Sequence, residues 1–526
     1  MDNFFKKKEV KSFLFTTMLY LSVFLILGFQ YETNDDSVVA KLIEQNYLSP
    51  FSFQWTSYVA NWLGKLFPIS GWGLFLFLPT YISSLKLIEI LFSNIENKLL
   101  KRCSIFVIII TLTDLLFQFQ FTKISSFLLI VSFLCLEEFF TTKKKNNLIF
   151  FLIFLIFGIS IRYKTLFIVL PFACLFTYFK YSKNKKLLLK RIGVFVLIFL
   201  LSFICNIIDQ NTLPKYQKDF LAFNEVRSNV LDFDKAKVSE DKLNLLQPEL
   251  SKNDFNIIDN YLYIDNEYFT SEKFLEIHEI INNRIKLSFT EIFNNIIKNL
   301  FLLLFHPLVL LLIYLLVLVK DKKNILYLLG MFSLAIIFTL LSRFPVRLIY
   351  SIAITGTLFF VYQNNNLEIS HNKILKLIII PIIFISIFTQ YSLPVFITKT
   401  NPVSIINSYI DNHSKDDFLY GYSILKIEQS SENFLSNKTD MPYPNRIFSG
   451  WTMGHPIFYD KLSDLKINNP IQDLVNKNNY YFVSYGNTSE CEYIKIYLKE
   501  HFNINAECKI KERINNFYIN KLERSN

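Results

Sequence analysis

The sequence lacks the short motifs that mark several classes of membrane enzyme and pump. It contains no glycine-rich phosphate loop, no closely spaced histidine pair of the zinc-protease type and no Gly-x-Ser-x-Gly elbow. These absences argue against ATP-driven transport, membrane proteolysis and serine hydrolysis. The sequence also shows no internal repeat, whereas many transporters are built from paired halves.

Cysteine is scarce, with six residues in a chain of 526. Four of them lie in apolar runs, where a thiol usually acts as a small hydrophobic group, and none of the spacings suits a metal site. The other two, Cys491 and Cys508, fall in the polar C-terminal tail. A disulfide between them is permitted if the tail lies outside the cytoplasm.

Apolar residues dominate the composition. The chain is 52% hydrophobic and 17% aromatic, with a mean hydropathy of +0.31, which favours a lipid-embedded protein. The net charge of +11 comes from short basic clusters between apolar runs, not from a basic face of a soluble domain. We therefore expect membrane lipids as partners and no nucleic acid.

The apolar runs predict about eleven transmembrane helices, because a hydrocarbon core of about 30 Å needs about 20 residues per crossing. The first run has no small-residue cleavage site after it, so we interpret it as a retained helix. The predicted spans are 12–29, 69–92, 103–120, 123–140, 147–161, 163–180, 190–208, 297–319, 324–341, 346–363 and 373–391.

Lys and Arg are concentrated in alternate short loops, starting with Lys6, Lys7 and Lys8. The positive-inside rule then puts the N-terminus in the cytoplasm. This predicts a transmembrane domain, 1–391, with outer loops at 30–68 and 209–296, and an extracytoplasmic domain, 392–526. The fold class is an all-α polytopic bundle with a small α/β domain at the C-terminus.

The tail has its own secondary-structure pattern. Residues 480–484 and 517–519 are typical of buried strands, and residues 490–502 have the spacing of an amphipathic helix. We therefore expect a folded domain there.

An acidic pair follows the first span, in Asn34-Asp35-Asp36. The apolar residues after it recur at helical spacing and predict a short helix along the membrane surface. One interpretation is that the acidic residues cap this helix. The other is that one carboxylate acts as a base toward an acceptor hydroxyl, while the second orients it or helps to hold a divalent metal.

The position of Asp35 and Asp36, the surface helix after them, the many short spans and the outer domain resemble the GT-C superfamily of membrane glycosyltransferases. The resemblance implies a sugar donor linked to polyprenyl phosphate, a glycan or lipid acceptor, and Asp35 or Asp36 as the base. Residues 220–274 also resemble the outer loop of a group of large bacterial membrane proteins, which favours the plasma membrane of a bacterium.

Asp114 lies inside the third apolar run, where a charge costs about 2.5–3.5 kcal/mol on insertion scales. We expect it in the outer half of its helix, facing the same cavity as the acidic pair and serving catalysis there as an auxiliary acidic group. The alternative is a hydrogen bond between helices. His306, next to Pro307, is expected to satisfy a backbone carbonyl freed by the proline, or to contact substrate.

Cations occur in outer loops against the general trend. Arg343 and Arg347 are the first candidates to neutralise a lipid phosphate. Further candidates are Arg162, Lys164 and Arg227. The alternative is anchoring to lipid head groups.

Three other functions remain open. A polysaccharide polymerase joining lipid-linked repeat units would also have a large outer loop with arginines. A flippase or transporter would bury several charges near the bilayer midplane. A passive assembly partner would tolerate every Asp and Arg substitution named above.

Overall fold

The structure of the chain is a computed structural model. It describes residues 8–32, 34–319, 321–341, 344–364, 381, 384, 387–388, 403–421, 423–424, 433–435 and 445–525. Arg343 and most of the predicted span 373–391 lie outside the described residues.

The chain divides into two compact units. Unit 1 comprises Met1–Thr212, Ile292–Phe396 and Glu432–Lys438. Unit 2 comprises Leu213–Glu291, Ile397–Ser431 and Thr439–Asn526.

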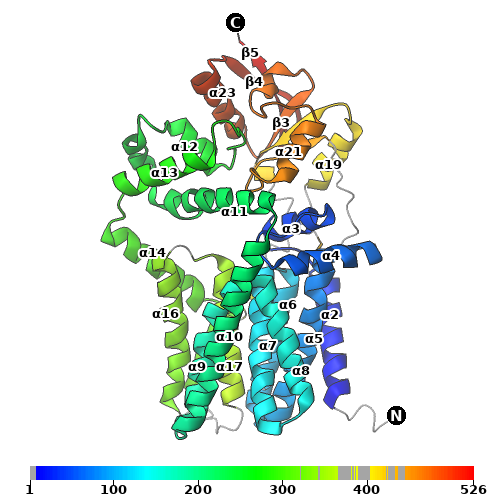
Figure 1. Ribbon diagram of the computed structural model, residues 1–526, viewed down its shortest axis with the longest axis vertical. Helices are drawn as coiled ribbons and strands as arrows, with labels where there is room; N and C mark the ends of the chain where they lie inside the picture. The colour runs from blue at the N-terminus through cyan, green and yellow to red at the C-terminus, as the bar shows by residue number, and fades with distance from the viewer. Residues whose placement is uncertain are drawn as a thin grey trace. The chain divides into compact units, whose positions relative to one another are not determined.

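Unit 1 is a helical bundle, in which the long helices run side by side (Figure 1). Its long helices are α2 (Lys8–Ile26), α5 (Gly71–Asn94), α6 (Lys98–Phe117), α7 (Phe121–Thr142), α8 (Lys145–Arg162), α9 (Leu166–Tyr181), α10 (Lys185–Thr212), α16 (Ile325–Leu341) and α17 (Val346–Gln363). It also contains the bent pair α14 (Phe289–Leu304, mostly in this unit) and α15 (Pro307–Leu318), and the short helices α3 (Asn34–Glu44), α4 (Gln54–Leu66), η1 (Tyr163–Thr165) and η5 (Lys322–Asn324).

Seven helices among the described residues are long and apolar enough to cross a membrane, or eight if α14 and α15 together form one span bent by 73°. The predicted number of about eleven is not confirmed. Three segments explain the difference. Helix α6 carries basic residues and Asp114, α8 and α9 follow each other without a gap over Lys145–Tyr181, and 373–391 is mostly undescribed.

The helices of unit 1 differ in burial. Most of α7 and α17 is buried against other helices, whereas α2, α10 and α16 expose large apolar side chains, including Met18, Leu200 and Leu341. Exposed apolar side chains on long helices are what a lipid environment accommodates. The bundle is therefore compatible with a multi-pass membrane protein.

Unit 2 contains a mixed five-stranded sheet and several short helices. The strand order is β2-β1-β3-β5-β4, with β1 parallel to β2 and β3, and β5 antiparallel to β3 and β4. The strands are β1 (Asp417–Tyr420), β2 (Arg446–Phe448), β3 (Tyr480–Tyr485), β4 (Ala506–Ile514) and β5 (Phe517–Arg524). The helices are α11 (Lys215–Ser228), η2 (Asn229–Asp234), η3 (Lys235–Lys237), η4 (Glu240–Leu246), α12 (Lys252–Asp259), α13 (Ser271–Arg284), α19 (Val403–Asn412), α21 (Pro456–Asp464), α22 (Asp473–Asn476) and α23 (Ser489–Phe502).

Residues 213–291 make up most of the outer loop that we predicted at 209–296, and they pack with the tail in unit 2. Apolar residues of this segment such as Phe274 and Ile277 share one buried core with Phe482 and Leu498 of the tail. Polar contacts add to this core, because Asp265 accepts hydrogen bonds from Asn469 at 3.0 Å and from Tyr497 at 3.0 Å. Hydrophobic burial therefore joins two segments that are distant in the sequence.

The predicted secondary structure of the tail is confirmed. Strand β3 covers 480–484, α23 covers 490–502 and β5 covers 517–519. Cys491 on α23 and Cys508 on β4 form a disulfide bond, which ties the helix to the edge strand of the sheet.

Candidate functional site

The short helix α3 is the predicted surface helix, and it lies across one end of the bundle of unit 1 (Figure 1). Its apolar residues Val39, Leu42 and Ile43 are buried, which explains why the amphipathic pattern forms a helix there. Asp35 and Asp36 lie in its first turn, near the positive end of the helix dipole. The packing of α3 therefore brings the acidic pair to the end of the bundle where α6 finishes and α7 and α17 begin.

Asp35 and Arg347 form an ion pair, which we call the outer pair. The distance from Arg347 Nη1 to Asp35 Oδ2 is 3.3 Å, and the two residues are 312 positions apart in the sequence. The side chains keep 19% and 15% of their surface exposed. A ligand can therefore reach a carboxylate and a guanidinium at the same place.

Asp36 has a different environment, because it is fully buried. Its Oδ1 accepts a hydrogen bond of 3.0 Å from the backbone N–H of Phe121, the first residue of α7. Burial raises the pKa of Asp36 well above its usual value; this hydrogen bond opposes the shift, and Asp35 adds to it. Asp36 thus joins α3 to α7 and is not accessible to a substrate in this structure.

Arg162, the last residue of α8, is a further charged residue beside the outer pair and Asp36. We call the outer pair, Asp36, Arg162 and the buried charges described next the charge cluster of unit 1. Its guanidinium lies over the rings of Phe51 and Phe121, at 5.5 Å and 5.1 Å from their centroids. Arg162 also interacts electrostatically with Arg347, Asp35 and Asp36. The two aromatic rings hold this cation beside the acidic pair.

Asp114 pairs with Lys123, and we call this the inner pair. Lys123 Nζ lies 2.6 Å from Asp114 Oδ1 and 3.0 Å from Glu32 Oε2, and both residues of the inner pair are only 1% exposed. On the other side of Asp114, His306 Nε2 lies 3.8 Å from Oδ2. The charge that the sequence places in an apolar helix is therefore compensated inside the protein.

A backbone contact positions Glu32 and Lys123. The segment after α2 pairs with the turn between α6 and α7, because Glu32 N donates to Phe119 O at 3.0 Å and Phe119 N donates to Gln30 O at 2.8 Å. Burial raises the pKa of Glu32, although Lys123 opposes this shift. The geometry of the cluster thus depends on this bridge as well as on the helices.

Of the predicted phosphate-binding residues, only Arg347 and Arg162 join the cluster within the described part of the chain. Lys164 is exposed in η1. Arg227 belongs to unit 2, where its guanidinium donates to Asn224 and to Tyr263 and is buried. Arg343 lies outside the described residues.

Sequence reasoning missed the roles of Glu32 and Lys123. The available signal was a lysine in the first turn of an apolar helix, nine residues after Asp114. An isolated charge in such a helix calls for a partner. His306 instead accepts a hydrogen bond from Leu308 N at the start of α15, so it caps that helix in addition to approaching Asp114.

The acidic pair does not suit a divalent metal in this arrangement, because Arg347 and Arg162 supply positive charge next to it. Among the described residues, one group of three possible ligands has its atoms within 4.8 Å of one another, namely Asp254, Glu500 and His501 in unit 2. His501 and Asp254 contact each other at 2.7 Å, and Ser251 donates to Glu500 at 2.9 Å. Because these three side chains are held by hydrogen bonds to one another or to Ser251, we interpret the group as structural and not as a metal site.

Comparison with known proteins finds no match for the chain among family models, curated proteins or solved structures.

Proposed function

We propose that the protein is a membrane glycosyltransferase that moves a sugar from a polyprenyl-phosphate carrier to an envelope glycan or lipid. The observation that carries the proposal is the outer pair. A partly exposed carboxylate, Asp35, lies 3.3 Å from a partly exposed guanidinium of Arg347, with Arg162 beside them, at the end of a bundle of apolar helices. Sugar transfer from a lipid phosphate needs a base and a cation at one place near the membrane surface.

Asp35 is the proposed base, since Asp36 is buried. The acceptor hydroxyl gives its proton to Asp35 while its oxygen attacks the anomeric carbon of the donor sugar. The bond between that carbon and the phosphate oxygen breaks, and its electron pair leaves with the polyprenyl phosphate. Asp36 is a positioning residue, which acts by holding α3 against the first turn of α7 through Phe121 N.

Arg347 and Arg162 are the proposed phosphate partners. The leaving phosphate gains negative charge as the bond breaks, and a guanidinium stabilises that charge with directed hydrogen bonds. Arg347 would then exchange part of its contact with Asp35 for the phosphate. This exchange would leave Asp35 freer to accept the proton.

The location of the inner pair argues against a transporter. Asp114 lies one turn before the end of α6, and Lys123 lies in the first turn of α7. Both are therefore near one end of the bundle, whereas the coupling residues of transporters lie near the bilayer midplane. The two charges are also paired with each other and nearly inaccessible, which favours a structural role.

The proposed setting is the plasma membrane of a bacterium, with the N-terminus in the cytoplasm and the C-terminal domain outside. The distribution of Lys and Arg supports this orientation. The disulfide between Cys491 and Cys508 is consistent with an oxidising compartment for that domain.

The test is complementation of a deletion strain, with envelope glycans analysed by mass spectrometry. We expect the wild-type chain to restore one sugar and Asp35→Asn to fail, because the amide cannot accept the proton. A general base contributes about 10²–10⁴-fold to such a rate. Glu44→Gln, a change of the same kind at the other end of α3, is the matched control and should restore the sugar.

Protein levels are compared in each strain. If Asp35→Asn restores the sugar at normal protein level, the transferase proposal is wrong. If loss of the chain shortens glycans without removing a sugar, the protein is instead a polymerase of lipid-linked repeat units.

A further inference from the structure

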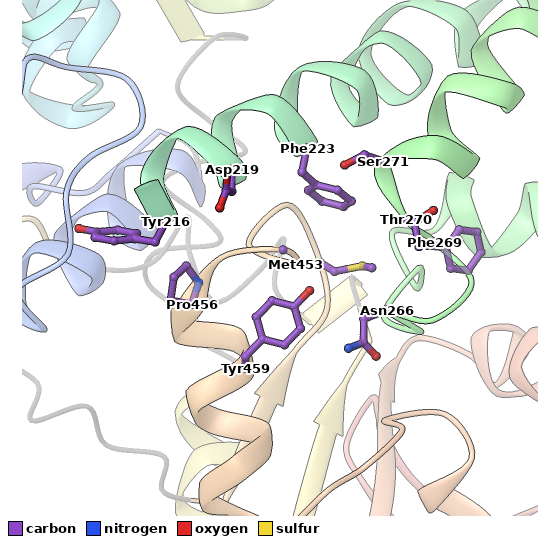
Figure 2. A pocket seen from close by; sticks show the side chains of 11 residues that line it. Tyr216, Asp219, Phe223, Asn266, Phe269, Thr270, Ser271, Met453, Pro456 and Tyr459 are labelled. Carbon is purple, nitrogen blue, oxygen red and sulfur yellow. The ribbon is translucent and has the colours of Figure 1, made fainter. Parts of the chain in front are cut away.

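Unit 2 contains a cavity of about 420 Å³ (Figure 2). None of its lining residues belongs to the charge cluster of unit 1. Its wall is formed by α11, by the start of α13 with the loop before it, and by the first turn of α21 with the loop before it. All three segments belong to unit 2, so the cavity is a property of this unit alone. Its volume is in the range of small-molecule sites, roughly 300–1,000 Å³.

The spacing of residues on α11 and α21 explains which side chains line the cavity. Tyr216, Asp219 and Phe223 occupy one face of α11, at intervals of three and four residues. Tyr459 lies one turn after the start of α21. Gly454 lets the connecting loop approach α11, since a Cβ atom there would lie 2.6 Å from the ring of Phe223 and its φ is +82°.

The cavity combines aromatic rings with hydrogen-bonding groups. Tyr216 and Tyr459 supply partly exposed rings, and Phe223 and Met453 form an apolar part of the wall. Asp219 is exposed and makes no hydrogen bond or ion pair within the described part of the chain. A ligand with both apolar faces and hydroxyl groups suits such a wall.

Asn266 adds a second observation. Its Oδ1 is buried and accepts no hydrogen bond among the described residues. The Asn266 side chain is hydrogen-bonded to the Tyr459 side chain. A buried acceptor without a donor is unfavourable by about 1–3 kcal/mol. A ligand hydroxyl would reach this oxygen only after the Asn266 side chain rotates, because the oxygen is buried in the structure.

The charge of the wall restricts the ligand further. No Lys or Arg is among the described residues that line the cavity, and its one ionisable acid is Asp219. A phosphate or carboxylate would therefore meet repulsion without compensation. The ligand should be uncharged and rich in hydroxyl donors.

We propose that this cavity binds an uncharged saccharide, with Tyr216 and Tyr459 against the apolar faces of the sugar and Asp219 accepting hydrogen bonds from its hydroxyl groups. That this saccharide belongs to the acceptor glycan rests on the proposed transferase function. The proposal that unit 2 binds a saccharide does not depend on the transferase function.

The test is calorimetric titration of the full-length protein in detergent with maltotriose, mannotriose and N,N′,N″-triacetylchitotriose, and with glucuronic acid as an anionic probe. We expect at least one neutral trisaccharide to bind and the anionic probe not to bind. Asp219→Asn and Tyr459→Ala should each raise the Kd of that saccharide about tenfold or more. Glu225→Gln, the same type of change as Asp219→Asn on an exposed position of α11 outside the wall, should leave it unchanged.

The proposal is overturned if none of the three neutral saccharides binds, if glucuronic acid binds better, or if the two cavity variants bind like the wild type. Asp35→Asn separates this result from the transferase proposal. It should retain saccharide binding, because Asp35 belongs to unit 1. Saccharide binding together with full glycan transfer by Asp35→Asn would leave the cavity proposal standing and remove the catalytic one.

Discussion

The outer pair and the inner pair each join an aspartate to a basic side chain, Arg347 in one and Lys123 in the other, but their surroundings differ. Asp35 and Arg347 retain partial access to solvent, whereas Asp114 and Lys123 are enclosed by helices, and Lys123 also contacts Glu32. A buried pair has lost its hydration and gains stability only from its own contacts. Exposure therefore separates charges that can serve a ligand from charges that hold the bundle together.

The most damaging change should be Lys123→Met, which breaks the inner pair. It leaves Asp114 and Glu32 buried without their cation, and breaking such a pair typically costs about 3–5 kcal/mol. The measurement is thermal unfolding of the detergent-solubilised protein. Lys65→Met, at an exposed position near the end of α4, is the control and should unfold like the wild type.

A second variant tests the reason for that loss. Adding Asp114→Asn to Lys123→Met removes one of the stranded charges and should recover part of the stability. If Lys123→Met unfolds like Lys65→Met, the inner pair does not stabilise the bundle and the comparison between the two pairs is wrong.

Arg347→Gln should lower activity strongly and stability only slightly, whereas Lys123→Met should mainly lower stability. We expect kcat/KM for sugar transfer to fall about 100-fold, since one charged donor to the transition state is lost. The free energy of unfolding should change less than in Lys123→Met, because the outer pair keeps part of its surface exposed. The charge swap Asp35→Arg with Arg347→Asp should keep a pair but not activity. Activity in the swapped variant would show that pairing alone matters.

Asp36→Asn should change how stability depends on pH. Burial raises the pKa of Asp36 above its unfolded value, so between these two pKa values the folded chain holds a proton that the unfolded chain releases. Its contribution to stability is complete below the unfolded pKa and is lost as pH rises through the folded pKa. A tenfold difference in proton affinity between the folded and unfolded chains corresponds to about 1.4 kcal/mol.

The expected result is that wild-type stability falls more steeply with rising pH than that of Asp36→Asn, in unfolding curves recorded from acid to neutral pH. The amide can still accept the hydrogen bond from Phe121 N, so the contact itself is retained. Parallel curves for the two proteins would contradict the assignment of Asp36 as a buried acid.

Tyr350→Phe should have the smallest effect. The Tyr350 hydroxyl donates to Thr111 O at 3.0 Å, and its ring lies 5.0 Å from Lys123 Nζ. The substitution removes one hydrogen bond, which is worth about 1 kcal/mol, and keeps the ring next to the inner pair. An unfolding temperature as low as that of Lys123→Met would mean that this hydroxyl, rather than the ion pair, is the main support of the region.

Much of the fold could be predicted because it follows local rules. The long apolar runs, the short helix at residues 34–44 and the strands of the tail each show a period that burial imposes on a continuous segment. The number of transmembrane spans was harder to predict from the sequence. A charged helix such as α6 and the closely spaced helices α8 and α9 depend on neighbouring helices as well as on their own composition.

The candidate site was only partly predictable for the same reason. Asp35, Asp36 and Asp114 could be singled out by their place in the sequence, and Arg347 by its position in an outer loop. Their partners could not be assigned, because Arg347 is 312 residues from Asp35 and Arg227 is held in the other unit.

The sequence by itself determined the lipid-compatible character of the bundle, the folded tail and the presence of charges that require compensation, because hydropathy and spacing act along the chain. Only the tertiary structure decided which charges meet, which of them stay accessible, and that residues 213–291 share a core with the tail. Those outcomes depend on packing between segments far apart in sequence, which no local pattern encodes.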